Sequence, residues 1–370
     1  MRKERIDAWL IFTREGAKDP LSKEFGLEAC TWRSAGILTR EDETIAIVGS
    51  YDVKQVERSG IYDQVIGYGG EGASLELSSI SSKLGFSKIA INESSDYGLA
   101  DGLTASMKRY LSKNMHGASF VSSEDLAIDL RGRLLPEETK KMRNAIKMTE
   151  EILDETQSHA MKIGRRDKDV FEHVQKITRE YGAGLSWDES MDPSLCVGSI
   201  DPQHSGYDNV LLREGKFLRI DFGIKLDGYC SDLQRDYYFG TPPKELKNDF
   251  GVAREANDAA LAKLSENSLG FEVDRAGRSV VTRNGFLNFP HGLGHTLART
   301  AHEIGPIFAP KWRSRYGHAM DKKIGTNICL TIEPTVYSKF GGINLEQDVL
   351  VNNEGRVEFL SLPQEEIISL

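Results

Sequence analysis

Two aspartates within residues 217–235, FLRIDFGIKLDGYCSDLQR, are spaced so that both could bind one metal centre. Asp221 and Asp232 lie in two short strand-like runs on either side of the dipeptide Asp227-Gly228. Asp-Gly favours a two-residue hairpin turn, because both central positions of that turn require positive φ. The segment is therefore predicted to form a β-hairpin that carries one aspartate on each side of its turn.

The register of this hairpin decides whether the two carboxylates converge. A two-residue loop places Asp221 opposite Gln234 and Asp232 opposite Gly223, so the aspartates become diagonal neighbours on one face. Diagonal neighbours are about 7–8 Å apart between backbones, which is within reach of a shared cation. Asp221 stands between two apolar residues, where an unpaired charge would be costly to bury, so we expect something cationic beside it.

Three histidines in residues 291–303 form a second candidate group. His291 and His295 occur in the pattern HGLGH, and His302 follows directly before Glu303. Histidine is the commonest metal ligand and exchanges protons near neutral pH. A single histidine is more often a structural residue, but the glycines here favour irregular backbone on which side chains can converge.

Two glutamates are embedded in apolar, strand-like sequence near the end of the chain. Glu333 lies in LTIEPTVY, residues 330–337, and Glu346 lies in INLEQD, residues 343–348. A lone buried glutamate usually forms an ion pair, and that alternative stays open here. Four embedded carboxylates with one or more histidines suit two divalent ions such as Mn²⁺, Co²⁺ or Zn²⁺. Two such ions can polarise a carbonyl group, which indicates a dinuclear hydrolase.

A glycine-rich segment offers a competing interpretation. Residues 67–72, GYGGEG, satisfy the GxGxxG pattern of a dinucleotide site, and Glu93 follows about 20 residues later. The first glycine lies inside an expected strand, however, and a glycine-rich loop before a helix is commonly only a turn. A nucleotide-dependent enzyme built on this loop is the weaker alternative.

The first part of the chain, to about residue 130, alternates short β-rich runs with helical segments. This alternation predicts an α/β domain. The strands are expected at 8–12, 35–39, 44–50, 63–69 and 88–93, and the helices at 52–59, 74–83 and 97–113.

The second part begins with a long amphipathic helix that follows Pro136. Its apolar residues Met142, Ile146, Leu153 and Ala160 recur near one face. Proline suits a helix start, so the domain boundary is placed near this residue. The expected domains are residues 1–132 and 133–370, with further helices at 168–181 and 244–266 and with strands and loops after Asn288.

Composition argues against several classes of function. With 39% hydrophobic and 28% charged residues, the 370-residue chain is typical of a globular protein with ample core. Its net charge of −9 argues against nucleic-acid or membrane partners, which require basic surfaces. Its four cysteines form no CxxC pair, which favours a reducing compartment and no structural zinc site. No apolar run approaches the roughly 20 residues of a membrane span or resembles a signal peptide, so we expect a cytoplasmic protein.

These residues, in this order, resemble the pita-bread metallopeptidases, in particular the aminopeptidase P and prolidase (Xaa-Pro dipeptidase) branch. The five metal ligands of that family match Asp221, Asp232, His295, Glu333 and Glu346. The resemblance implies two divalent ions per chain, Mn²⁺ or Co²⁺ before Zn²⁺ or Fe²⁺. It also implies a homodimer whose chains have a creatinase/prolidase-like amino-terminal α/β domain and an α+β pita-bread catalytic domain with a curved antiparallel sheet.

The same resemblance implies roles for residues around the metal ions. Glu333 would carry a proton from water to the leaving nitrogen, and His302 and His204 would hydrogen-bond the developing oxyanion. His291 would line the pocket for the residue after the scissile bond, and Tyr337 matches a tyrosine of the substrate site. The implied catalytic residues are His204, His302 and Glu333, and the implied substrate contacts are His204, His291, His302 and Tyr337.

Four positions depart from the family pattern without removing a metal ligand. Asn344 stands where arginine is usual, Gln234 where threonine is common, and Thr335 where glycine is common. Arg299, four residues after the ligand histidine, would either replace the missing guanidinium or face solvent. The expected function is hydrolysis of the Xaa-Pro bond in dipeptides or short peptides. A related aminopeptidase or amidohydrolase without proline specificity and a non-catalytic binding homologue are the alternatives.

Overall fold

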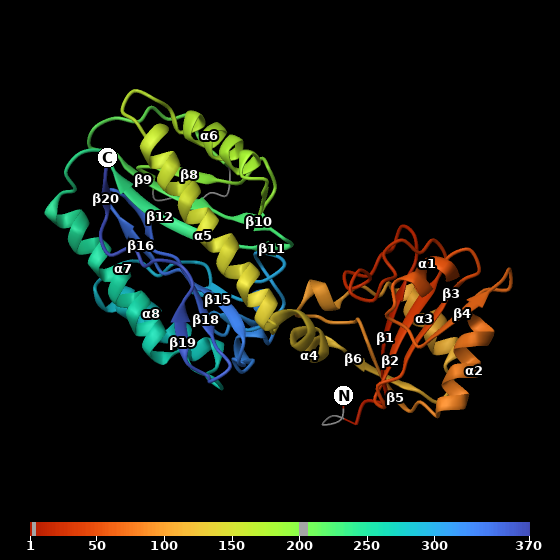
Figure 1. The fold of residues 1–370 in the computed structure, drawn as a ribbon. Helices are drawn as coiled ribbons and strands as arrows, with labels where there is room; N and C mark the ends of the chain where they lie inside the picture. The colour runs from red at the N-terminus through yellow and green to blue at the C-terminus, as the bar shows by residue number, and fades with distance from the viewer. Residues whose placement is uncertain (2–4, 200–205) are drawn as a thin grey trace. The chain divides into compact units, whose positions relative to one another are not determined.

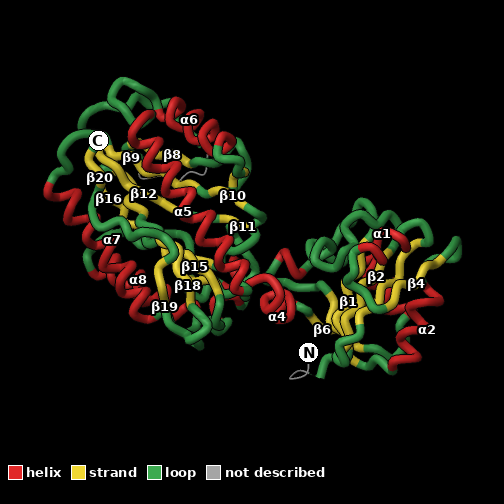
Figure 2. Tube along the Cα trace, in the orientation of Figure 1, coloured by secondary structure: helices red, strands yellow, loops and turns green. Residues whose placement is uncertain are grey.

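The computed structural model describes residue 1 and residues 5–199 and 206–370. The chain forms two compact units, Met1–Leu130 and Arg131–Leu370 (Figure 1). Each unit has its own hydrophobic core, and in each the strands are flanked by helices (Figure 2).

The amino-terminal unit is an α/β fold around a six-stranded sheet with strand order β4-β3-β2-β1-β5-β6. Strands β1, β2 and β3 pair antiparallel, whereas β4, β5 and β6 join in parallel. The elements are β1 (Ala8–Thr13), β2 (Ser34–Thr39), β3 (Thr44–Gly49), α1 (Val53–Arg58), β4 (Gln64–Tyr68), α2 (Ser74–Leu84), β5 (Lys88–Ile91), α3 (Ala105–Asn114), β6 (Ser119–Ser122) and α4 (Glu124–Ala127). The predicted α/β fold is confirmed.

Two local predictions for this unit need correction. Strand β6 is not predicted, because only two of its four residues are apolar; the other two are exposed serines. The helix expected from residue 97 begins only at Ala105. Its start is fixed by Thr104, whose side chain accepts a hydrogen bond from the amide of Met107.

In its described residues, the carboxy-terminal unit is assembled from short sheets and four long helices. Its longest sheet has the strand order β20-β12-β9-β8. The helices are α5 (Pro136–His159), α6 (Asp167–Glu180), α7 (Lys244–Lys263), α8 (Gly270–Arg283) and the short α9 (Arg313–Tyr316). The strands are β7 (Gly184–Leu185), β8 (Ser194–Val197), β9 (Phe217–Phe222), β10 (Ile224–Leu226), β11 (Tyr229–Cys230), β12 (Leu233–Tyr238), β13 (Gly294–His295), β14 (Ile307–Phe308), β15 (Ile328–Ile332), β16 (Thr335–Ser338), β17 (Gly341–Asn344), β18 (Gln347–Val351), β19 (Val357–Phe359) and β20 (Ile368–Ser369).

The predicted long helix and hairpin are both present. Helix α5 begins at Pro136, as expected. Strand β9 pairs antiparallel with β12 so that Asp221 lies opposite Gln234, which is the predicted register. Asp227 and Gly228 form the turn between β10 and β11, and both have positive φ, 51° and 86°. Helix α8 is not predicted, and the residues after it form the expected strands and loops apart from α9.

Alternation along β9 separates the core of this unit from its polar face. Leu218, Ile220 and Phe222 belong to the buried cluster that also contains residues of α5 and α6. Because successive side chains of a strand point to opposite faces, Arg219 and Asp221 lie on the other face. These polar residues therefore lie on the face of the sheet opposite the hydrophobic core.

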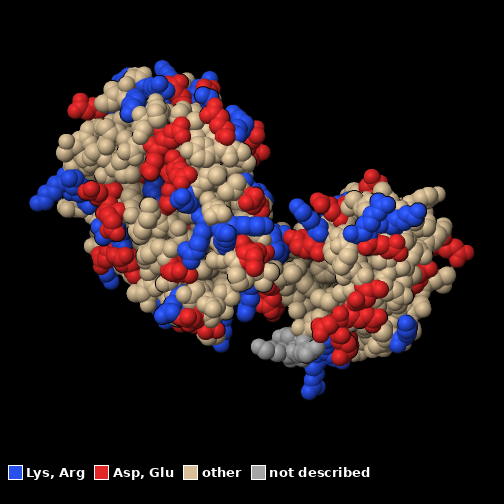
Figure 3. All heavy atoms as spheres, viewed as in Figure 1, with Lys and Arg blue, Asp and Glu red and all other residues tan. Residues whose placement is uncertain are grey.

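The surface in view in Figure 3 carries acidic and basic side chains interspersed over both units. Among the described helices, none is long and apolar enough to cross a membrane. All four cysteines lie in the described part of the chain, and none of them forms a disulfide.

Candidate metal centre

A cavity of about 530 Å³ opens on the polar face of β9 and β12. This volume is within the range of small-molecule sites in proteins. The lining includes all five residues that match metal ligands, namely Asp221, Asp232, His295, Glu333 and Glu346. The fold thus brings together residues from the hairpin and from the last third of the chain.

Four of these side chains are in close contact. One ligand atom each from Asp232, His295 and Glu346 lies within 4.8 Å of the others. His295 Nε2 is 3.7 Å from Asp232 Oδ2 and 3.6 Å from Glu333 Oε1. This spacing allows one cation to contact several of these groups.

Backbone hydrogen bonds hold the histidine and a glutamate side by side. The amide of His295 donates to Thr331 Oγ1 at 3.1 Å. The amide of Glu333 donates to the carbonyl of Leu293 at 2.7 Å. Strand β13 and the end of β15 are joined by these bonds, so both side chains enter the cavity from a fixed backbone.

A buried asparagine on α7 positions both glutamates. Asn257 Nδ2 donates to the carbonyl oxygens of Ile332 and Leu345, at 3.1 Å and 3.2 Å. These residues directly precede Glu333 and Glu346. Sequence reasoning missed Asn257, because its contacts lie far away in the sequence and no local pattern marks it.

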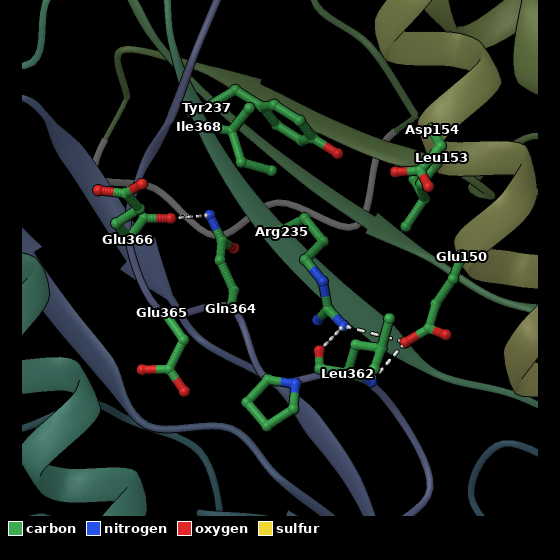
Figure 4. A pocket seen from close by; sticks show the side chains of 11 residues that line it. Glu150, Leu153, Asp154, Arg235, Tyr237, Leu362, Gln364, Glu365, Glu366 and Ile368 are labelled. Carbon is green, nitrogen blue, oxygen red and sulfur yellow. Dashed lines mark hydrogen bonds and ion pairs between the residues drawn. The ribbon is translucent and has the colours of Figure 1, made fainter.

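The backbone of Glu346 is also fixed from the opposite face of β12. Arg235 donates to the carbonyl oxygens of Glu346 and Leu362, both at 2.9 Å. Its guanidinium lies 3.8 Å from the carboxylate of Glu150 on α5, as Figure 4 shows together with the bond to Leu362. The arginine side chain therefore connects α5 and β12 to the backbone of Glu346.

Burial disfavours charge on these carboxyl groups in the metal-free protein. Burial raises the pKa of Glu333 to about 8, and the charge of Asp221 adds to that rise. Burial, reinforced by neighbouring carboxylates, also raises the pKa of Asp232 and of Glu346 well above their ordinary values. Burial lowers the pKa of His295, so its ring is neutral and able to bind a metal. Such a cluster ionises fully only beside a cation.

Glu346 shows most directly that a cation fits here. Its side chain is fully buried, and neither carboxylate oxygen has a hydrogen-bond partner among the residues that the structure describes. Leaving a buried carboxylate unpaired costs several kcal/mol, on the order of 3–5. A divalent ion held by Glu346, Asp232 and His295 would supply the missing partner, and this mixed oxygen and imidazole set suits Mn²⁺, Co²⁺ or Zn²⁺.

His302 and Trp187 form an aromatic wall beside the proposed ligands. The ring centroids of His302 and His295 are 4.3 Å apart, with an interplanar angle of 89°. The ring of Trp187 lies 4.6 Å from that of His302, and both residues line the cavity. No sequence motif marks Trp187, so it is not predicted.

His291 also lines the cavity and is held as a neutral ring. Its Nδ1 lies 2.7 Å from the carbonyl oxygen of Gly292, so Nδ1 carries the proton. Its Nε2 lies 2.8 Å from Thr335 Oγ1 and accepts from that hydroxyl. Burial lowers the pKa of His291 to about 4, which keeps the ring uncharged near pH 7.

Three further residues singled out from the sequence are not placed in this cavity. His204 lies outside the described residues. Tyr337 packs beside the apolar cluster around α7 and α8 and is absent from the cavity lining described above. Arg299 binds the carboxylate of Glu138 at 2.6 Å, with its side chain 27% exposed. Its guanidinium is engaged by α5 and is not part of the cavity lining, so Arg299 does not replace the missing guanidinium.

The glycine-rich segment lies in the other unit and lacks the geometry of a dinucleotide site. Gly67 is paired with Val48 inside β4 and does not follow the strand. Glu93 binds Lys108 Nζ at 2.6 Å on an exposed surface. Both residues have structural roles, which removes the main support for the nucleotide interpretation.

Comparison with known proteins agrees with this geometry. The model of metallopeptidase family M24 matches residues 140–353, more than half of the chain. An uncharacterized peptidase of Staphylococcus epidermidis is 24% identical over 324 residues, covering 86% of this chain and 85% of the relative. An uncharacterized peptidase of Staphylococcus aureus is 25% identical over 260 residues, covering 69% and 70%.

Solved structures extend the likeness over the full length. The X-Pro aminopeptidase of Thermotoga maritima superposes with a TM-score of 0.74 at 24% identity, covering 100% of both chains. The Xaa-Pro dipeptidase of Bacillus anthracis has a TM-score of 0.76 at 23% identity, covering 100% of this chain and 96% of that one. At this level of identity the superposition establishes the fold, an amino-terminal α/β domain followed by a metallopeptidase domain.

Proposed function

The chain belongs to metallopeptidase family M24, and we propose that it hydrolyses the Xaa-Pro bond of dipeptides or short peptides with two divalent metal ions. The observation that carries the proposal is the cavity of buried carboxyl groups around His295, in which Glu346 has no partner for either oxygen among the described residues. The proline preference is supported by the likeness to two solved structures, an X-Pro aminopeptidase and an Xaa-Pro dipeptidase.

We assign the metal ions to Asp221, Asp232, His295, Glu333 and Glu346. Mn²⁺ or Co²⁺ suits this set best, and Zn²⁺ or Fe²⁺ is also compatible with it. Ions bound there would polarise the scissile carbonyl group and activate water at neutral pH. By the same family resemblance, we propose that the protein is a homodimer.

Glu333 is the proposed proton carrier. Without a cation, burial raises its pKa to about 8 and keeps it protonated at pH 7. With that proton displaced by bound metal, Glu333 would accept a proton from water and return it to the leaving nitrogen. The amide of Gln234 donates to Glu333 Oε2 at 3.4 Å and helps to fix its orientation.

The histidines position the substrate. His302 faces the cavity beside His295 and can hydrogen-bond the oxyanion that develops on the carbonyl oxygen. His204 is proposed for the same task from its place in the sequence. His291, neutral and bound to Thr335, lines the space for the residue after the scissile bond.

A peptidase without proline preference is the second candidate. Asn344 favours it, because this residue lines the cavity where the family usually has an arginine. The two candidates share the metal centre. They differ only in which substrate residue they accept directly after the scissile bond.

A specificity profile tests the proposal. The protein is stripped of metal, reloaded with Mn²⁺ or Co²⁺, and assayed with alanyl-proline, alanyl-alanine and alanyl-prolyl-alanine. We expect metal-dependent cleavage with kcat/KM at least about tenfold higher for a proline substrate than for alanyl-alanine. Equal cleavage of alanyl-alanine would favour the second candidate, and no metal-dependent cleavage of any of the three would contradict both.

A further inference from the structure

We infer that a second cavity of the carboxy-terminal unit binds a linear aliphatic diamine or polyamine, with one ammonium group at Asp154 and another at Glu366. The cavity lies on the face of β12 opposite the proposed metal ligands. The inference therefore goes beyond the proposed peptidase function and does not rest on it.

This cavity, which we call the tail pocket, has a volume of about 280 Å³ and lies between α5, β12 and residues 362–368. Arg235 and Tyr237 line it from β12. Successive side chains of a strand point to opposite faces, so these residues lie opposite Asp232 and Gln234, which line the metal cavity. The tail pocket and the metal cavity are therefore on opposite faces of one strand.

Carboxylates stand on two sides of the tail pocket (Figure 4). Glu150 and Asp154 come from α5, whereas Glu365 and Glu366 come from the segment 362–368. The lining also includes the apolar residues Leu153, Leu362, Pro363 and Ile368. A ligand that spans the pocket therefore meets acidic groups at both ends and apolar surface as well.

Two of these four carboxylates already have cationic partners. Glu150 lies 3.8 Å from the guanidinium of Arg235, and Glu365 lies 2.7 Å from an arginine of α7. Asp154 and Glu366 form no ion pair with another residue in the described part of the chain. One uncompensated carboxylate thus remains on each side of the pocket.

The hydroxyl group of Tyr237 is an independent sign of a ligand. This residue is only 2% exposed, yet no hydrogen bond joins its hydroxyl to another residue that the structure describes. In Figure 4 the hydroxyl points into the pocket, toward the side on which α5 carries Asp154. Burial raises the pKa of Tyr237 and the charge of Asp154 adds to that rise, which agrees with this orientation. Because buried hydroxyl groups are normally paired, the tail pocket offers an oxygen to a ligand.

Neither an anion nor a metal ion suits the tail pocket. An anion would have to bind Arg235, whose guanidinium already donates to the carbonyl oxygens of Glu346 and Leu362. A metal ion requires several ligand atoms close to one another. Among the described residues, the only such group of acidic, histidine or cysteine side chains is Asp232, His295 and Glu346 in the metal cavity.

A linear diamine matches the features that remain. It carries charge only at its two ends, and its methylene chain can cover the apolar lining. One ammonium group would pair with Asp154 and donate to the hydroxyl of Tyr237, while the other would pair with Glu366. A lysine side chain of another protein offers only one ammonium group, so it would leave one of the two carboxylates unpaired. Because exposed ion pairs are weak, we expect a Kd of about 10⁻⁵–10⁻⁴ M.

The test titrates the full chain, loaded with Mn²⁺, with putrescine, cadaverine and spermidine in a calorimeter. At least one of these amines should bind with a Kd of about 10⁻⁵–10⁻⁴ M and a stoichiometry of about one per chain. Butylamine, which has a single ammonium group, should bind at least about tenfold more weakly, and 1,4-butanediol should not bind. The inference is overturned if no diamine or polyamine binds more tightly than butylamine.

Three substitutions locate the bound amine. Asp154→Asn and Glu366→Gln each remove one exposed carboxylate and should weaken binding at least about fivefold. Tyr237→Phe should weaken it at least about threefold, because a hydrogen bond from a charged group is lost. Its Tm should not fall, because no described residue bonds this hydroxyl. Unchanged affinity in all three variants would place the amine elsewhere and contradict the inference.

Glu151→Gln is the matched control. It alters an exposed glutamate of α5 that pairs with Lys147 and is not part of the pocket lining. The affinity for the amine should change by less than about twofold. If this control weakens binding as much as Asp154→Asn does, the amine is only attracted by the net negative charge of the chain, and the inference fails.

A titration of the metal-free protein separates this inference from the proposed function. Because the tail pocket and the metal cavity lie on opposite faces of β12, the affinity for the amine should stay within about threefold, and added Mn²⁺ should not displace it. Displacement would show that the amine binds in the metal cavity instead. If the protein cleaves no peptide but binds the amine in the tail pocket, the peptidase proposal fails and this inference stands.

Discussion

At the scale of single residues, burial determines what the acidic groups can do. Asp232, Glu333 and Glu346 would be ordinary carboxylates in water, but within the cavity each has a raised pKa because burial and its neighbours oppose its charge. A cation reverses this balance by pairing with all of them at once. The proposed chemistry therefore depends on the same burial that makes the metal-free site unfavourable.

Replacing Glu333 with glutamine tests its role as proton carrier. Glutamine keeps the shape of the side chain but cannot accept a proton, so kcat should fall by about 10²–10⁴-fold. Circular dichroism should show an unchanged fold. Glu255→Gln, which alters an exposed glutamate bound to Arg283, is the matched control and should retain activity. Activity of Glu333→Gln near that of the control would contradict the assignment.

Metal binding should release protons at neutral pH. Since burial raises the pKa of Glu333 to about 8 from 4.5, the metal-free protein keeps this proton at pH 7 and a bound cation must displace it. Titration calorimetry in buffers of different ionisation enthalpy should show more than about one proton released at pH 7 and fewer above pH 9. An enthalpy that is independent of the buffer would contradict this prediction.

The same raised pKa affects the stability of the metal-free protein. Between pH 4.5 and about 8 the folded chain retains a proton that the unfolded chain has already lost. The Glu333 contribution to the free energy of unfolding therefore decreases as pH rises through this interval. Thermal unfolding should therefore be measured with and without metal. The stabilisation of the protein by metal should increase from pH 4.5 to about 8.

Sequence reasoning reached many of these residues but not all of them. The proposed ligands are recognisable because each is an acidic or histidine residue in a strand-like or glycine-rich context. Asn257 and Arg235 act through contacts that no local pattern shows. For Arg299 the sequence leaves two alternatives open, and its carboxylate partner Glu138 on α5 is 161 residues away in the chain, so no local pattern shows the pair.

At the scale of elements, the hairpin was predictable because turn and register follow from one dipeptide. Helix α8 was not, because Gly270 and Gly277 lower its intrinsic helix preference. The structure explains Gly277, since a Cβ there would lie 2.9 Å from the carbonyl oxygen of Ala256 on α7. Close packing of two helices, which is a tertiary effect, overrides local preference in this segment.

Close backbone approach also fixes the metal centre. A side chain at Gly294 would collide with the carbonyl oxygen of Thr331, so Gly294→Ala should shift β13 and with it His295. We expect metal affinity to fall by at least about tenfold. Losses of this size are typical when a residue that orients a metal ligand is removed.

Gly251→Ala is the control for this prediction. Gly251 lies in α7, and a Cβ there would meet no atom within 4 Å. This change should leave metal binding intact and stabilise the protein by up to about 1 kcal/mol, because alanine favours helix. Calorimetry and chemical denaturation check both variants, and normal metal binding by Gly294→Ala would show that the close approach is not required.

At the scale of the whole molecule, the candidate site belongs to one unit. The five proposed ligands, together with Asn257 and Arg235, all lie in Arg131–Leu370. A chain of residues 131–370 should therefore bind metal with an affinity within about threefold of the full chain, measured by calorimetry. A fragment that folds, as judged by circular dichroism, but binds no metal would show that the first unit is needed for the site.

The central claim is that two metal ions in this cavity support peptide hydrolysis. The most direct measurement adds Mn²⁺ or Co²⁺ stepwise to metal-free protein and follows cleavage of alanyl-proline. The account predicts no cleavage without metal and a cleavage rate that rises to a plateau at about two metal equivalents per chain. In Asp232→Asn, the cleavage rate should not rise when metal is added. Cleavage that persists without metal, or that is unchanged in Asp232→Asn, would contradict it.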